Sequence, residues 1–339
     1  MTQPLNLKES TILATVSGSR VLELHTEDSD VDIVGIGILP YDFRNSLNGN
    51  WEQTEDPKEL EWIKDYCPED IKQAANTNGF EGKIFNLKKF MTLAAKANPN
   101  ILEPLFCDEK HILYITPEGK ELRKHRNIFV SKIAFKSYAG YGFAQLKRMK
   151  RHREYLLNPP IEPTRELFGL SKGHRLLNRE QLAAIGIISN EKLSAIGVSE
   201  DKIKEIRAEA DYQKKRTEWK HFEDWRKNRN PKRMLIEDKC LYDSKNGLHL
   251  MRLLLTAQTL AKTGKLVITP TPEQRQYLLD IRHGNISYEE IMIKAEQIDE
   301  EVKQTEKDST VPNKPNYTDI EMLYKSLLIQ HDYLKKHKV

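Results

Sequence analysis

Gly18-Ser19-Arg20, followed after a short connection by Ser29-Asp30-Val31-Asp32-Ile33-Val34-Gly35, is the stretch that decides the fold of this 339-residue chain. Gly18 and Ser19 form a tight turn whose backbone N–H groups and hydroxyl can face an anion. Residues 11–16 are apolar and β-branched, which suits a strand or a buried helix end, and residues 31–38 are the strongest strand candidate. The stretch therefore predicts a turn, a connection and then an acidic strand.

Two carboxylates stand at the start of that strand. Residues two apart share a face of a strand, so Asp30 and Asp32 point the same way with Cα atoms roughly 6–7 Å apart. Such a pair can hold divalent ions about 3.5–4 Å apart, which clamp a phosphoryl group in transit. Asp-x-Asp also occurs in solvated turns. The Gly-Ser turn before it and the apolar strand after it favour a metal site, because charges beside a buried strand are costly unless neutralised.

Composition limits the class of protein. Charged residues make up 31% and hydrophobic residues 38% of the chain, and the mean hydropathy is −0.65, which predicts a helix-rich, soluble protein of two domains. We expect no membrane segment, because no run approaches ~20 apolar residues, and the N-terminus lacks a signal pattern. Cys67, Cys107 and Cys240 are far apart in the chain and lack a C-x-x-C spacing. This pattern favours neither a disulfide framework nor a zinc site, and it suits a protein of the reducing cytoplasm.

The order of the first stretch resembles the active-site signature of the DNA polymerase beta superfamily of nucleotidyltransferases. The resemblance implies that Asp30 and Asp32 hold two Mg²⁺ ions, with Mn²⁺ as a substitute. It also implies a set of phosphate contacts made by Gly18, Ser19, Arg20 and Ser29. The chain departs from the pattern at Glu23, where relatives often carry glycine, and this puts the shape of the connecting loop in question.

The superfamily also requires a third carboxylate from a neighbouring strand. Residues 80–85 suit a strand, and Glu81 within it is the best-placed candidate, although an ordinary exposed glutamate fits equally well. Asn86 then caps a helix whose buried face carries Leu87, Phe90, Met91 and Ala94.

A second resemblance narrows the family. The phrase LKKFMTLAAKANPNILEPLF, residues 87–106, is similar to the RNA-repair-associated branch of these nucleotidyltransferases, which is frequent in phages and bacteria. That likeness implies that Asn98 and Glu103 shape the site. Their alternative roles are a helix cap and a salt-bridge partner.

A second anchor is the helix that follows Tyr242-Asp243. Lys245, His249 and Arg252 are spaced i, i+4, i+7 and so lie on one helical stripe. Three potential cations that no acid matches suit a triphosphate, whose charge such groups stabilise during transfer. The same family carries a similar helix, with the departure Asn246-Gly247 in this chain. On its own, His249 would more often be a core histidine.

The prolines between Asn158 and Pro163 predict a domain boundary. We therefore expect a catalytic domain over 1–157, a helical domain over 158–308 with a charged insertion at about 170–212, and a linker with a final helix over 309–339. Residues 51–75 are interpreted as a surface loop with a short helix, and a short strand is expected after residue 265. The aromatic stripe Trp219, Phe222 and Trp225 suits a core better than a base-stacking platform.

Together these features predict an α+β fold, with a polymerase-beta-like mixed sheet followed by a mainly helical part. The expected reaction moves a nucleoside monophosphate from an NTP to a hydroxyl. Basic clusters at 147–153 and 214–233 and the family likeness favour an RNA 3′ end as acceptor. The alternatives are a protein or small-molecule acceptor, or a non-catalytic RNA-binding protein with the same fold.

Overall fold

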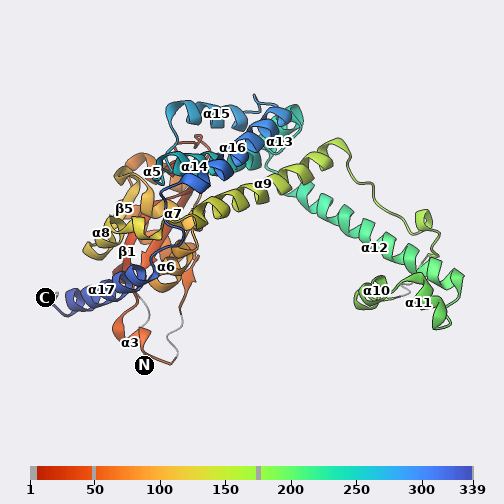
Figure 1. Ribbon diagram of the computed structural model, residues 1–339, viewed down its shortest axis with the longest axis horizontal. Helices are drawn as coiled ribbons and strands as arrows, with labels where there is room; N and C mark the ends of the chain where they lie inside the picture. The colour runs from red at the N-terminus through yellow and green to blue at the C-terminus, as the bar shows by residue number, and fades with distance from the viewer. Residues whose placement is uncertain (1–5, 48–50, 173–176, 338–339) are drawn as a thin grey trace. The chain divides into compact units, whose positions relative to one another are not determined.

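The structure is a computed structural model that describes residues 6–47, 51–172 and 177–337. It divides into two compact units. Unit 1 comprises Met1–Met149 and Ser244–Val339, and unit 2 comprises Lys150–Asp243. These units differ from the predicted division after residue 157, because α9 (Ile133–Leu157) continues through that point as one helix and the chain rejoins unit 1 at Ser244. The predicted α+β class is confirmed (Figure 1).

A five-stranded mixed sheet forms the centre of unit 1. Its strands are β1 (Thr11–Val16), β2 (Val31–Gly37), β3 (Gln53–Thr54), β4 (Phe80–Asn86) and β5 (Ile112–Ile115). Their spatial order is β3-β4-β2-β1-β5. Strand β2 runs parallel to β4, and the other neighbours pair antiparallel. The two strands that carry the predicted carboxylates are therefore direct neighbours.

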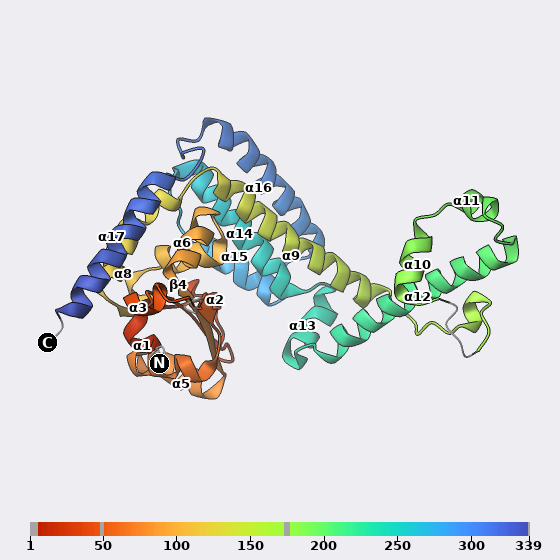
Figure 2. The ribbon, with the colours of Figure 1, turned by 90° about the horizontal axis from the view of Figure 1, so that it is seen from below.

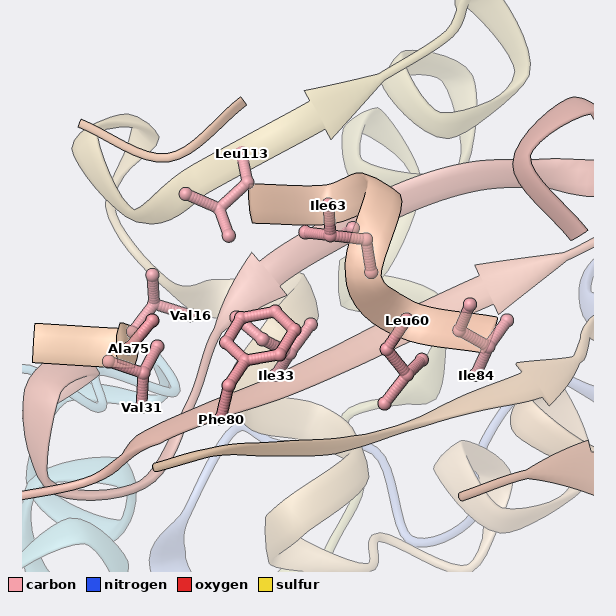
Figure 3. Packing of buried hydrophobic residues seen from close by; sticks show 10 residues of the cluster. Val16, Val31, Ile33, Leu60, Ile63, Ala75, Phe80, Ile84 and Leu113 are labelled. Atoms are coloured by element: carbon pink, nitrogen blue, oxygen red, sulfur yellow. The ribbon is translucent and has the colours of Figure 1, made fainter. Parts of the chain in front are cut away.

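One face of the sheet packs under the segment between β3 and β4. Val31 and Ile33 of β2 point to this face, as strand alternation requires. Leu60 of α4 (Pro57–Leu60) and Ile63 of η1 (Glu61–Tyr66) pack on them, and α5 (Glu69–Thr77) completes the cover (Figure 3). The interpretation of residues 51–75 as a surface loop with a short helix is thus wrong in its surface position, since Leu60 and Ile63 are fully buried in the core, whereas the expected helix is present as α4 and α5.

Three further helices pack against strands of the sheet. They are α6 (Leu87–Ala95), α7 (Pro99–Phe106) and α8 (Pro117–Lys124). Phe85 of β4 packs against Phe90 of α6 with ring centroids 6.3 Å apart. The predicted apolar face of α6 is confirmed, because Leu87, Phe90, Met91 and Ala94 are all buried. The final helix α17 (Tyr317–Lys336) contacts α8 and α6 and so belongs to unit 1 (Figure 2).

The remaining long helices of unit 1 are α14 (Ser244–Thr263), α15 (Pro272–Arg282) and α16 (Tyr288–Asp308). α14 packs against both α15 and α16. Gly142 of α9 faces α14, where an added Cβ would sit 3.5 Å from the Leu250 side chain, an ordinary van der Waals distance, so the packing of these two helices does not depend on a glycine here. The strand expected after residue 265 is wrong: residues 265–271 form no regular element, and Thr271 instead caps α15.

Unit 2 consists of the last turns of α9 and further helices. These are η4 (Glu166–Phe168), α10 (Arg179–Gly186), α11 (Asn190–Ala195), α12 (Glu200–Lys227) and α13 (Pro231–Cys240). Tyr155 of α9 packs against Phe222 and Trp225 of α12, with ring centroids 5.4 and 5.2 Å away. Phe222 and Trp225 therefore help to hold two helices together, as the preference for a core role predicted.

The short elements of unit 1 complete the description: α1 (Leu7–Ser10), α2 (Gly18–Val21), α3 (Tyr41–Arg44), η2 (Glu109–His111) and η3 (Arg126–Phe129). Within the described ranges, none of the helices combines the length and apolar character needed to cross a bilayer.

Candidate active site

The turn after β1 and the strand β2 lie against each other. The backbone N–H of Ser17 donates to the carbonyl of Asp32 at 2.8 Å. Gly18 has φ +64°, a left-handed conformation that glycine adopts without strain. A Cβ at this position would also collide with the Asp32 carboxylate. Gly18 is thus required both by its backbone conformation and by the side chain that lies beside it.

Three carboxylates gather at this end of the sheet. The parallel register of β2 and β4 pairs Asp32 directly with Glu81, so both side chains lie on the same face. Asp30 precedes β2 by one residue and has the same parity as Asp32. Asp32 is half-buried, whereas Asp30 and Glu81 are exposed. The structure therefore brings together the two aspartates and the third carboxylate that the sequence named.

The pKa of the Asp32 carboxyl reflects its burial and how close these three carboxylates are. Burial raises the pKa of the Asp32 carboxyl, and the neighbouring Asp30 and Glu81 carboxylates raise it further. Lys245 and Arg20 act in the opposite direction. Like charges held this close destabilise one another unless a cation joins them, so the site favours binding of a positive ion.

The donor set suits a hard divalent cation. Carboxylate oxygens are the ligands that Mg²⁺ prefers, and one or two of them suffice when water and substrate phosphates supply the rest. Across the residues that the structure describes, no three His, Cys, Asp or Glu side chains converge closely enough to hold an ion by themselves. The arrangement thus fits an ion that shares its coordination with a bound phosphate.

Lys245 is the predicted cation that reaches this site. It is exposed in the first turn of α14 and is close enough to lower the pKa of Asp32. His249 lies one turn further along and is half-buried. Lys245 can therefore contribute positive charge opposite the carboxylates.

Arg252, the third residue of the predicted stripe, is buried in the core. It is 7% exposed and forms an ion pair with Glu103 of α7, which is 3% exposed. The prediction that no acid matches the stripe is thus wrong at Arg252, because a buried guanidinium must find a partner in the core. For Glu103 the structure bears out the alternative role of salt-bridge partner. Asn98 caps α7 through a hydrogen bond from the Asn100 backbone N–H at 3.1 Å.

Arg20 and Ser29 serve the loop between α2 and β2. Arg20 is buried, and it donates from Nε to the Asp30 carbonyl at 3.0 Å and from Nη2 to the Ser29 carbonyl at 2.7 Å. The Ser29 hydroxyl accepts a hydrogen bond from the Thr26 backbone N–H at 2.9 Å. Arg20 and Ser29 were predicted as phosphate contacts. In the structure, both fix the conformation of the loop that leads into Asp30. Ser19 remains half-buried in α2.

Glu23 adopts an unusual backbone conformation for a residue with a side chain. Its φ is +56°, in the left-handed region that glycine adopts without strain. Its carboxylate forms ion pairs with Lys110 and with Arg275, 3.1 Å from Nη1 of Arg275. The Arg275 Nε also donates to the Glu23 carbonyl at 2.9 Å. These contacts hold a conformation that glycine would adopt without them.

Two arginines of α15 were missed by the sequence analysis. Arg275 contacts Glu23, and Arg282 donates to the Leu24 carbonyl and to the Thr26 hydroxyl at 3.3 Å. Both lie far along the chain from the loop that they contact: Arg275 is 252 residues from Glu23, and Arg282 is 258 residues from Leu24. No local spacing connects them to the loop, and only the packing of α15 reveals their role.

Fold and site together define a class. A mixed sheet with a glycine turn against one strand carboxylate, and a second carboxylate on the parallel neighbour, is the arrangement of a polymerase-beta-like nucleotidyltransferase domain. Residues 5–159 match a family of proteins described as the RNA repair pathway DNA polymerase beta family, which confirms the predicted resemblance. The match ends before Lys245. No curated protein and no solved structure matches the chain.

Proposed function

We propose that this protein transfers a nucleoside monophosphate from an NTP to the 3′ hydroxyl of an RNA and releases pyrophosphate. The observation that carries the proposal is the Asp32 carboxylate lying against Gly18 and paired in register with Glu81. This arrangement supports an acidic ion site beside a turn whose backbone N–H groups can meet a phosphate. The family match to RNA repair proteins supports the same class of reaction.

The carboxylates of Asp30, Asp32 and Glu81 would hold the divalent ions. Two Mg²⁺ ions bound there would lower the pKa of the acceptor hydroxyl and stabilise the charge that develops on the leaving pyrophosphate. Gly18 and Ser19 would orient the triphosphate, and Lys245 would add positive charge beside it. Arg20 acts on the site indirectly, by holding the backbone of Ser29 and Asp30.

The reaction balances as a single displacement. The acceptor oxygen forms a bond to the α-phosphorus, and the bond from that phosphorus to the bridging oxygen breaks. Pyrophosphate leaves with the electron pair, and the hydroxyl proton passes to solvent. The chain supplies position and charge for this step.

An incorporation assay tests the proposal. Purified protein is incubated with each labelled NTP, Mg²⁺ and RNAs that differ in their 3′ ends, with cell-lysate protein as a separate acceptor. We expect label on RNA and release of pyrophosphate. Label that appears on protein alone would overturn the RNA acceptor.

The double variant Asp30→Ala with Asp32→Ala tests the site itself. We expect it to lose turnover while its circular dichroism spectrum and RNA affinity are kept. Asp42→Ala, which removes an exposed carboxylate outside the site, is the matched control and should keep full activity. Undiminished turnover by the double variant would contradict an enzymatic role for the aspartates.

A further inference from the structure

Positive charge is unequally distributed between the two units. Unit 2 carries 21 Lys and Arg against 16 Asp and Glu, whereas unit 1 carries 33 against 34. Within unit 2, residues 214–233 hold nine basic and three acidic side chains. The net positive charge of the whole chain therefore comes from unit 2. Within unit 2, the positive charge is concentrated in the second half of α12 and the start of α13.

Part of this charge forms a row on α12. Arg216, Lys220 and Lys227 are spaced i, i+4, i+11, which places them within about 40° of one another around the helix and over about 17 Å along it. Phe222 and Trp225 lie on the opposite side, where they pack against α9. In this half of α12 the row consequently faces away from the side that packs against α9; Lys220 and Lys227 are exposed, and Arg216 is half-buried.

The end of α9 extends the basic surface. Lys150 and Arg151 are exposed in the turns just before Tyr155. Because His152 and Tyr155 pack against Trp225, with ring centroids 5.5 and 5.2 Å away, these cations lie on the helix next to α12. Two neighbouring helices of unit 2 thus present basic side chains.

The row differs from an ordinary solvated charged face. Lys215 and Arg226 form ion pairs with Glu218 and Glu223, at 3.0 and 2.8 Å. Among the residues that the structure describes, Lys220 and Lys227 have no carboxylate within 4.0 Å. Cations that lack an internal partner release counterions when they bind a polyanion, which favours binding to nucleic acid.

We infer that the second half of α12 and the end of α9 form a binding surface for the phosphate backbone of single-stranded RNA. A row about 17 Å long can meet several phosphates of one strand, because phosphates follow one another every few ångströms. The choice of RNA rests on the proposed function. The surface would hold the body of the RNA whose 3′ end reacts.

The triple variant Arg216→Gln, Lys220→Gln and Lys227→Gln tests the surface in the full-length protein. The matched control is Lys192→Gln, Lys202→Gln and Lys204→Gln, which removes the same charge from exposed positions elsewhere in unit 2. Affinity for a fluorescein-labelled single-stranded RNA is measured by anisotropy between 50 and 300 mM KCl, without Mg²⁺ so that no transfer occurs.

We expect the α12 variant to bind RNA about 10- to 100-fold more weakly at 100 mM salt. Its slope of log affinity against log salt should be shallower by about 2, as the loss of three phosphate contacts requires. The control should bind like the unchanged protein. An α12 variant with unchanged affinity and slope, or a control that loses equally, would overturn the inference.

The outcome is separate from that of the proposed function. If RNA binding falls in the α12 variant but label never enters RNA, the surface stands and the acceptor assignment fails. If label enters RNA with an unchanged KM in the α12 variant, the acceptor assignment stands and the surface fails.

Discussion

The acidic site and the Glu103–Arg252 pair lie in the same unit but differ in how their charges are compensated. In the acidic site, burial raises the pKa of Asp32, and the neighbouring Asp30 and Glu81 carboxylates raise it further. Glu103, by contrast, is buried together with the guanidinium that neutralises it. The carboxylate that serves the fold is matched inside the protein, whereas, on the proposed function, the carboxylates of the acidic site are left for a bound ion to match.

The largest expected effect follows from replacing Asp32 by Asn. We expect transfer activity to fall at least about 10³-fold, equivalent to about 4 kcal/mol, because a ligand for the ions that stabilise the transition state is lost. Stability should be unchanged or slightly higher, since one of three repelling charges is removed. Rates of NTP incorporation and urea unfolding curves measure the two effects, and a large loss of stability would contradict the comparison.

The buried pair should show the reverse behaviour. Arg252→Met leaves Glu103 buried without its cation, and we expect a loss of about 3 kcal/mol in the free energy of unfolding. The double variant Arg252→Met with Glu103→Met removes both charges and should recover most of that loss. Urea unfolding of both variants and of Glu103→Met completes a double-mutant cycle. A coupling energy near zero would show that the two side chains do not depend on each other.

A second matched carboxylate extends the comparison to pH. Burial alone would raise the pKa of Glu118, but hydrogen bonds from His331 and Thr116 outweigh it and hold the pKa at about 2. Because the folded value lies below the ordinary 4.5, the stabilisation is complete above about pH 4.5 and is lost as the pH falls toward 2. We expect about 2 kcal/mol of stability to be lost from this group between pH 6 and pH 3.

Glu118→Gln should remove that part of the acid sensitivity. Unfolding by urea at pH 6, 4.5 and 3 measures it, with Glu109→Gln at an exposed position as the control. Equal pH dependence in Glu118→Gln and in the unchanged protein would contradict the assignment of this stabilisation to the contact between α8 and α17.

The same contrast explains what the sequence could predict. The proximity of Gly18, Asp30 and Asp32 was predictable because they lie close together in the chain, and the parity of a strand fixes the face that the two aspartates share. Glu81 could be named only as a candidate, because the sequence does not reveal the strand register that pairs Glu81 with Asp32 in the folded sheet.

The roles of residues with distant partners could not be predicted. Spacing placed Arg252 on a stripe with Lys245, but Glu103, which pairs with it, lies 149 residues away. Arg20 suited a phosphate contact by type, yet its partners are carbonyls of the loop. Leu60 and Ile63 were assigned to a surface because their segment is polar on average, whereas its few apolar side chains, with Ala75 among them, pack on one face of the sheet.

The smallest expected effect concerns Glu23, where a strained backbone and ion pairs oppose each other. Glu23→Ala loses the side-chain ion pairs to Lys110 and Arg275 but keeps the cost of a left-handed residue, whereas Glu23→Gly loses the same ion pairs and removes that cost. We therefore expect Glu23→Gly to be more stable than Glu23→Ala by about 1 kcal/mol. Urea unfolding at low and high salt measures both variants beside the unchanged protein. If alanine and glycine prove equally stable, the φ of +56° imposes no cost, and the ion pairs are not needed to hold the loop in place.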